Sequence, residues 1–334
     1  MTWDALLPRN AARLMRDSRG LAAGSSPAAP ADVTFSFFAP RNPAVSLLGD
    51  FTTWSPQAME SDERGWWYAR RRLTDGMYQY RFQVQSVNRW AEGQWVDVID
   101  PRSPSLASDR TTNCICIADG QIKRDAHIWR HDDVPLALDE GLMPVRLTAE
   151  SPWSRGVAPT WQGVLGALDE IAAAGVRAVI VPGIEAAPGL GHDPRCPFCP
   201  PSECAEPTSF KRMVDECHGR GVRVIVEMEC GRGDGVGALA QIDYDYWYAA
   251  RHTVNWNAPE SPPHFDYARR DEGLGLFPAQ EFMRACVFHW IDTYHIDGIR
   301  FLGAEGAADR SFLAQLGAEA RARTALKPFL VDVE

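Results

Sequence analysis

The hydrophobic pattern of this chain changes its period near residue 140, and this change limits the possible folds more than any other feature. From Val33 to about Ala118, apolar residues alternate with polar ones in short runs separated by turn residues. Beyond residue 140, short apolar runs alternate with longer segments whose apolar residues have helical spacing. The first pattern predicts antiparallel strands, and the second predicts a parallel sheet covered by helices. We therefore expect a multidomain β plus α/β chain.

The first pattern predicts an immunoglobulin-like β-sandwich of roughly 90 residues. It occupies residues 32–120, after an N-terminal segment and a flexible, small-residue linker at 1–31. A weak helical pattern lies within the first 20 residues. The strands are expected at 33–40, 44–51, 66–73, 78–85 and 114–118.

The second pattern covers residues 141–334 and follows a linker at 121–140. Its strands are nearly continuous in apolar residues, as buried parallel strands are. They are expected at 142–148, 176–183, 222–230, 296–303 and 328–334. The helices between them are expected at 161–175, 209–221, 279–295 and 309–324.

Composition narrows the class of partner. A formal net charge of −10 argues against a nucleic-acid or anionic-membrane binder, because such surfaces need clustered cations. The 12 tryptophans suit a sugar polymer, although most tryptophans in any protein belong to its core. The sequence shows neither a signal-peptide pattern nor an apolar run long enough to cross a membrane, so we expect a cytoplasmic protein. Nothing in the sequence calls for a cofactor, and it does not identify any protein partner.

Four motifs of the predicted sandwich carry a resemblance: LLGDFTTW (47–54), DGMYQYRFQV (75–84), EGQW (92–95) and DPRSP (100–104). In order and spacing they resemble the family 48 glycogen-binding modules of branching enzymes, isoamylases and the AMP-activated kinase β subunit. The resemblance implies an α-glucan partner such as glycogen or starch. It also implies that Trp54 and Trp95 stack on glucose rings while Arg81 and Asn113 bind hydroxyl groups. The alternative is a sandwich that only packs against the second domain.

Further motifs lie in the second domain: AAAGVRAVIVPG (172–183), GHDP (191–194), SFKRMVDECHGRGVRVIVE (209–227), FDYARRDE (265–272) and YHIDGIRF (294–301). Together they are similar to glycoside hydrolase family 13, in particular to glycogen branching enzymes and trehalohydrolases. The resemblance implies an incomplete (β/α)8 TIM-type barrel of about five strands. Five strands leave a barrel with an open edge, so either the chain is a fragment or truncated product, or something else covers that edge.

The resemblance also implies a catalytic site that has degenerated. Family members need a carboxylate nucleophile and a second carboxyl group as acid/base. The nucleophile follows the strand arginine by two residues, a position that Leu302 occupies after Arg300. The acid/base position aligns with Val333, and a slip of one residue would bring in Asp332 or Glu334.

Asp297, Arg300 and Glu334 are therefore the vestigial catalytic candidates, and Asp297 has a structural role as its alternative. A substitute nucleophile from Glu227, Glu229 or Glu305 is a further alternative. The family's hydrogen-bonding histidine is absent after the third strand, and His192 replaces an aromatic tyrosine.

A cysteine-rich loop does not belong to the family pattern. Cys196, Cys199 and Cys204 have partial zinc-ligand spacing, which His192, Cys217 or His218 could complete. The alternative, which we favour, is an ordinary cysteine-rich loop in a reducing compartment, so we expect no bound metal.

Three hypotheses remain open at the level of sequence. The first is a non-catalytic α-glucan-binding protein related to 1,4-α-glucan branching enzymes. The second is a truncated chain of an active branching enzyme or related α-glycosidase. The third is a degraded product without an independent fold.

Overall fold

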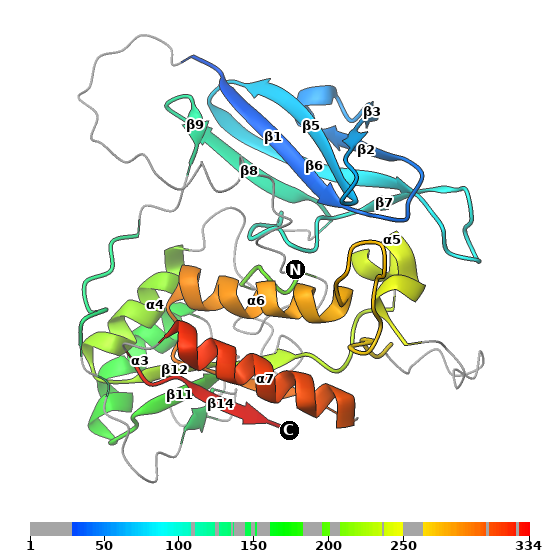
Figure 1. Cartoon of the computed structure of the whole chain (residues 1–334). Coiled ribbons are helices and arrows are strands. Elements are labelled where there is room, and N and C mark those ends of the chain that lie inside the picture. The colour runs from blue at the N-terminus through cyan, green and yellow to red at the C-terminus, as the bar shows by residue number, and fades with distance from the viewer. Residues whose placement is uncertain are drawn as a thin grey trace.

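The structure is a computed structural model, and it consists of a β-sandwich that lies against an α/β domain (Figure 1). It describes residues 29–107, 111–123, 127–134, 136, 144–147, 151, 161–182, 196–200, 208–235, 237–249, 263–304, 307–324 and 327–334. The predicted helical segment near the N-terminus lies outside these residues.

Two antiparallel sheets form the sandwich, as the alternating pattern predicts. One sheet has the order β1-β5-β4, and the other has the order β3-β2-β6-β8-β9 with β7 also paired to β6. All five predicted strands are present, while β7 and the shortest strands were not predicted. The bounds are β1 Ala31–Phe38, β2 Val45–Gly49, β3 Gln57–Ala58, β4 Glu60–Ser61, β5 Trp66–Leu73, β6 Gly76–Gln85, β7 Trp95–Val98, β8 Asn113–Ala118 and β9 Gln121–Ile122.

Aromatic side chains from β1 and β6 form the centre of the sandwich. The ring centroids of Phe37 and Phe82 lie 4.3 Å apart, and those of Phe35 and Tyr80 lie 4.9 Å apart. Successive side chains of a strand point to opposite faces. The intervening residues of β6, which include Arg81, therefore face away from this core.

The α/β domain contains a parallel sheet in the sequential order β10-β11-β12-β13-β14. Its predicted strands and helices are confirmed, and α5 was not predicted. The bounds are β10 Val145–Arg146, α3 Trp161–Ala173, β11 Ala178–Val181, α4 Thr208–Gly219, β12 Arg223–Glu229, α5 Ala238–Trp247, α6 Pro278–Tyr294, β13 Gly298–Leu302, α7 Ala307–Arg323 and β14 Leu330–Val333. Within the described part of the chain, no helix has the length and apolar character that a membrane crossing requires.

The two faces of the parallel sheet have different surroundings. One face, which includes Val179, Val224 and Ile299, belongs to a large apolar core shared with the helices. The other face contributes Ile180 and Ile225 to a small separate cluster. A helix-covered outer face and a narrow inner layer are typical of a barrel wall.

The sandwich shares part of its apolar core with the α/β domain. Phe38 and Trp66, at the ends of β1 and β5, are members of the large core around the parallel sheet. Phe38 lies 6.1 Å from the ring of Trp247 on α5. Figure 1 shows α5 and α6 below the sandwich, between it and the sheet.

Buried asparagines add polar contacts to this interface. The side chain of Asn88 donates to the carbonyl oxygens of Ala240 and Gln241 and accepts from the amide of Tyr244 at 2.8 Å. Asn42 donates to the carbonyl oxygen of Ile242 at 2.9 Å. These bonds satisfy buried backbone groups of α5, which would otherwise destabilise the interface.

Replacement of Asn88 by alanine should lower the free energy of unfolding by about 2 kcal/mol, because it leaves buried backbone groups of α5 without partners. Urea denaturation measures this change. Gln121→Ala, at an exposed position, is the control and should leave stability unchanged. A stability of Asn88→Ala equal to that of the parent chain would refute this account of the interface.

Candidate functional site

The outward face of the six-stranded sheet carries three of the four predicted glucan-binding residues. Arg81 lies on β6, Trp95 lies on β7, and Trp54 follows β2. The Arg81 guanidinium lies 5.4 Å from the centroid of the Trp54 ring. Trp95 is 48% exposed, an unusual exposure for so large an apolar side chain. Flat aromatic surface beside a cationic hydrogen-bond donor suits the faces and hydroxyls of a sugar.

Polar neighbours orient Arg81 on this face. Its guanidinium forms an ion pair with Asp97 at 2.7 Å, and Asp97 also accepts a hydrogen bond from Gln83 at 2.9 Å. The backbones of Gln83 and Asp97 are paired across β6 and β7, which places both side chains on the same side of the sheet. Sequence reasoning did not identify these two residues, although the alternation of β6 could have indicated Gln83.

The backbone of Trp54 has a conformation that non-glycine residues rarely adopt. Thr53 and Trp54 have φ values of 50° and 59°, in the left-handed region. The turn is closed by a hydrogen bond of 3.0 Å from the Trp54 amide to the Gly49 carbonyl. A Cβ atom on Gly49 would lie 2.7 Å from the backbone oxygen of Gln79, so the close approach of the turn to β6 requires glycine. The conformation costs about 1–2 kcal/mol per residue and fixes where the indole points.

Asn113 is not part of this face. The structure buries it completely, and its amide oxygen accepts a hydrogen bond of 2.7 Å from the backbone of Asp100. Its amide nitrogen donates back to the carbonyl of Asp100 at 3.3 Å. Both ends of the side chain are thus used to fix the 100–104 turn, and Asn113 cannot reach a ligand on the surface.

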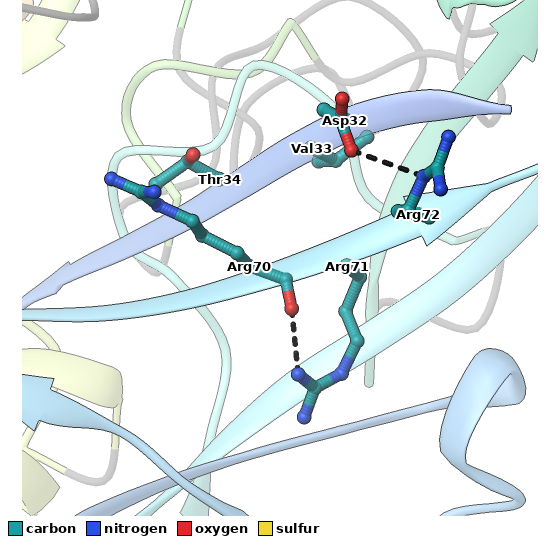
Figure 2. Close-up of a pocket in the computed structure, with 6 residues that line it drawn as sticks. All are labelled: Asp32, Val33, Thr34, Arg70, Arg71 and Arg72. Atoms are coloured by element: carbon teal, nitrogen blue, oxygen red, sulfur yellow. Dashed lines mark hydrogen bonds and ion pairs between the residues drawn. The ribbon is translucent and has the colours of Figure 1, made fainter.

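The other sheet of the sandwich, at β1 and β5, has a different chemistry. It contains a hollow of about 450 Å³ between β1 and β5, shown in Figure 2. Its ion pair, Asp32 with Arg72 at 3.4 Å, joins strongly exposed side chains and contributes little to stability. None of the described residues that line the hollow is aromatic, so it offers no stacking surface. They are Asp32, Val33, Thr34, Arg70, Arg71 and Arg72.

Arg300 is the centre of the charged cluster at the carboxyl ends of the parallel strands. Its Nε lies 2.9 Å from an oxygen of Asp332. Its Nη1 lies 3.6 Å from Glu227 and 3.7 Å from Glu334. The structure therefore brings Arg300 and Glu334 together, as two of the three vestigial candidates.

Glu227 has a second arginine partner. Arg146 on β10 donates to both oxygens of Glu227, with distances of 2.9 Å and 2.7 Å, and Glu227 is only 2% exposed. This two-pronged ion pair fixes the orientation of the Glu227 carboxylate. Sequence reasoning missed Arg146, because a lone arginine in a short strand carries no signal of its partner.

Leu302 is the last residue of β13, and its backbone is paired with that of Glu229 on β12. Glu229 accepts a hydrogen bond from the backbone of Arg232 at 3.1 Å. Val333 alternates with Asp332 and Glu334 on β14, so it faces away from Arg300. Glu305 lies outside the described residues.

Asp297 lies at the opposite end of β13 and does not join Arg300 and Glu334. It is completely buried, accepts a hydrogen bond of 2.8 Å from the amide of Val224 and lies 2.8 Å from His218 Nε2. Lys327 lies 3.1 Å from its other oxygen. Burial alone would raise the pKa of Asp297, but the His218 hydrogen bond, with the charge of Lys327, holds it below its usual value.

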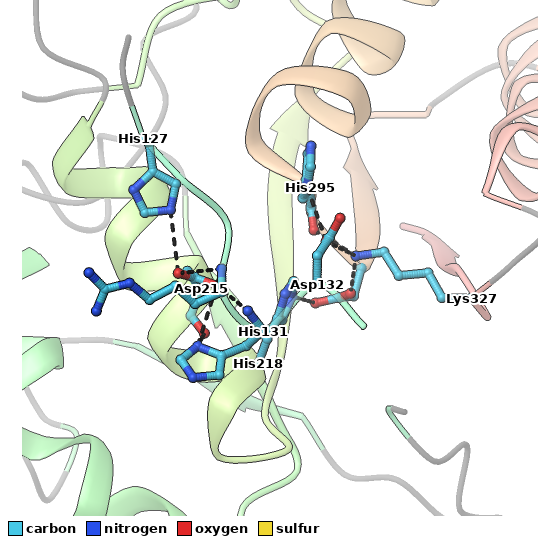
Figure 3. A network of polar contacts seen from close by, with 9 residues as sticks. His127, His131, Asp132, Asp215, His218, His295 and Lys327 are labelled. Carbon is cyan, nitrogen blue, oxygen red and sulfur yellow. Dashed lines mark hydrogen bonds and ion pairs between the residues drawn. The ribbon is translucent and has the colours of Figure 1, made fainter. Parts of the chain in front are cut away.

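Figure 3 shows the polar network around His218, to which the segment 127–134 is attached. His131 and Arg130 donate backbone hydrogen bonds to Asp215 of α4. His295 pairs with Asp132 at 3.0 Å and stacks on Trp129 at 4.0 Å. This network fixes the segment after the sandwich to the amino-terminal side of the parallel sheet.

The described cysteines of the cysteine-rich loop are buried at the domain interface. Cys196 donates to the backbone oxygen of Ser103 at 3.1 Å, and Cys199 packs in the same cluster. Cys217 lies 3.6 Å from the sulfur of Met213. His218 is bound to Asp297, while Cys204 and His192 lie outside the described residues. The zinc site therefore stays a hypothesis.

Comparison with known proteins agrees with this architecture. Residues 22–103 match the model of carbohydrate-binding module 48 (isoamylase N-terminal domain). The chain is 25% identical over 295 residues to the 1,4-alpha-glucan branching enzyme GlgB of Bordetella parapertussis, a match that covers 81% of this chain and 37% of that enzyme. It is 29% identical over 111 residues to the corresponding enzyme of Rhodospirillum rubrum, covering 33% of this chain and 14% of that enzyme.

Solved structures share the fold at low sequence identity. A pullulanase from Bacillus acidopullulyticus has a TM-score of 0.67 at 18% identity, covering 94% of this chain and 42% of that protein. A putative alpha amylase from Salmonella typhimurium has a TM-score of 0.64 at 17% identity, covering 93% and 50%. The chain thus carries an N-terminal carbohydrate-binding module 48, followed by part of a TIM barrel like those of α-amylase family proteins. It spans well under half the length of the matched branching enzymes.

Replacement of Asp297 by asparagine should lower stability at neutral pH and flatten its dependence on pH. Because the pKa of Asp297 is lowered in the folded state, its ionised form stabilises the fold above the unfolded pKa of about 3.9. This stabilisation is lost as the pH falls through the folded pKa. Urea denaturation from about pH 7 to about pH 3 measures it, with the exposed Asp133→Asn as control. Parallel curves for parent and Asp297→Asn would refute the assignment.

Proposed function

We propose that this chain is a cytoplasmic, non-catalytic α-glucan-binding protein. Its ligand is a glycogen- or starch-like polymer, bound on the outward face of the six-stranded sheet. The single observation that supports this most is the exposed Trp95 on the same sheet face as the Trp54–Arg81 pair. The indole rings of Trp54 and Trp95 supply contact area for a sugar with little loss of side-chain entropy. Arg81 and Gln83 supply hydrogen bonds to it.

Two features of the barrel mouth support the absence of catalysis. An aliphatic side chain, Leu302, stands where the resemblance places the nucleophile, and it cannot form a glycosyl ester. Glu227, the most buried carboxylate of the cluster, is held by Arg146 through both oxygens. The charged cluster therefore fills the mouth with internal ion pairs, and these pairs compete with a substrate.

An active branching enzyme or related α-glycosidase is the second candidate function. One observation favours it: Glu227 and Glu334 both approach the same nitrogen of Arg300, so two carboxyl groups converge at the barrel mouth. Retaining glycosidases use two such groups about 5–5.5 Å apart. Segments not described here, including Glu305, would have to complete that site.

Trp54→Ala and Trp95→Ala should each weaken binding to glycogen by at least about tenfold, or about 1.4 kcal/mol, because each removes a stacking surface. Affinity electrophoresis in glycogen-containing gels gives the measurement. Trp90→Ala is the matched control: Trp90 is 46% exposed but lies against Tyr244 of α5, at 5.8 Å. If Trp54→Ala and Trp95→Ala are retarded by glycogen as strongly as Trp90→Ala and the parent chain, the proposed face does not bind glycogen.

Incubation of the chain with amylose should leave the iodine-staining spectrum unchanged, because Leu302 cannot act as the nucleophile. A 1,4-α-glucan branching enzyme, assayed in parallel, is the positive control. A time-dependent loss or blue shift of the iodine complex that disappears in Glu334→Gln would support the second candidate and refute the first.

A further inference from the structure

An exposed methionine lies on the same sheet face as the proposed glucan-binding residues. Met77 of β6 is 57% exposed, more than any other large apolar side chain in the described part of the sandwich. It precedes Arg81 by four residues, so both side chains project from the outward face, about 13 Å apart along the strand. Trp95 is paired with Gln85, four residues after Arg81. Arg81 is therefore flanked at equal spacing by two exposed apolar side chains.

Single exposed apolar residues are common on protein surfaces and need no explanation by themselves. Met77 differs because it lies in line with a row of polar side chains on β6. The row consists of Gln79, Arg81 and Gln83. Apolar surface at both ends of such a row suits a sugar chain, since each glucose ring has apolar faces and a rim of hydroxyl groups. The thioether of methionine is flexible and polarizable, so it adapts to an irregular ligand surface.

Gln79 lies between Met77 and Arg81 and is exposed. Its side-chain oxygen accepts a hydrogen bond of 2.7 Å from the hydroxyl of Thr112, which fixes the orientation of the amide group. Within the described part of the chain, the side-chain nitrogen of Gln79 has no hydrogen-bond partner. An oriented amide with its N–H groups available is a suitable donor to a sugar hydroxyl.

The turn that carries Trp54 is joined to β6 at the same residue. The carboxylate of Asp50 accepts a hydrogen bond of 2.7 Å from the backbone N–H of Gln79. The close approach of Gly49 to the backbone oxygen of Gln79 brings the turn to the same point. The Trp54 turn therefore lies next to the part of β6 that leads from Arg81 to Met77.

We infer that Met77 and Gln79 form a further glucan subsite, which extends the binding face toward the start of β6 and favours longer α-glucan chains. The inference rests on the proposed function, because it concerns the same ligand and the same face. The Met77 side chain covers the apolar face of one glucose ring, and the Gln79 amide donates to a hydroxyl group. A short oligosaccharide held at Trp54 and Arg81 does not reach Met77, whereas a longer one does.

Isothermal titration of the full chain with maltotriose and with maltoheptaose tests this subsite. We expect Met77→Ala to bind maltoheptaose about fivefold more weakly than the parent, or about 1 kcal/mol, and to bind maltotriose equally well. Gln79→Ala should show the same selective loss, and Met77→Leu should restore binding because it keeps the apolar surface. Ile128→Ala is the matched control, since Ile128 is 78% exposed but lies outside the sandwich, and it should bind like the parent.

Oxidation of the parent chain gives a second readout that needs no variant. Hydrogen peroxide should convert the exposed Met77 to its sulfoxide, and saturating maltoheptaose should slow this reaction while saturating maltotriose should not. Mass spectrometry of peptides measures the rate. If Met77→Ala binds maltoheptaose as tightly as the parent, or if maltoheptaose gives no protection, the subsite is refuted and the proposed function stands. A parent chain that binds neither oligosaccharide nor glycogen would refute the proposed function, and the subsite with it.

Discussion

Phe38 and Trp66 extend from the sandwich into the apolar core around the parallel sheet, and the arrangement of both domains depends on this shared core. Burial of large aromatic rings is a strong and non-directional stabilising force, and buried hydrogen bonds such as those of Asn88 add direction to it. With this side of the sandwich occupied, the outward face of the six-stranded sheet, which includes the exposed Trp95, is where we propose that a glucan binds. A cavity of about 560 Å³, lined by residues of both domains, lies where the two surfaces do not close against each other.

The barrel mouth holds a cluster of paired charges. Arg300 and Arg146 stabilise carboxylates that would otherwise repel one another. Glu227 is the buried member of the cluster, so loss of Arg146 would leave a buried charge without its main partner, which is costly. The cluster is therefore an ordinary structural element of an open parallel sheet, whose strands end together at this edge. The ion pairs among its own residues are enough to explain why these charges occur together.

Periodicity predicted the fold well, because most elements here are long or strongly patterned. It missed α5, whose Asp243 has a non-helical backbone within the segment, and β7, which has only four residues. The resemblance named Trp54, Arg81 and Trp95, and the structure brings these three residues together on one face. It failed for Asn113, because motif spacing does not reveal that both the oxygen and the nitrogen of its side-chain amide are hydrogen-bonded to the backbone of Asp100. The Arg146–Glu227 pair was out of reach for a similar reason: it joins residues 81 apart in the sequence.

The left-handed turn at Trp54 has a consequence for how this surface evolves. A glycine there would relax the backbone, so the native fold tolerates a local penalty in order to display an indole in one orientation. Selection for thermal stability alone would favour glycine at this position. If related chains keep an aromatic residue at this left-handed position, that residue is selected for contact with a ligand.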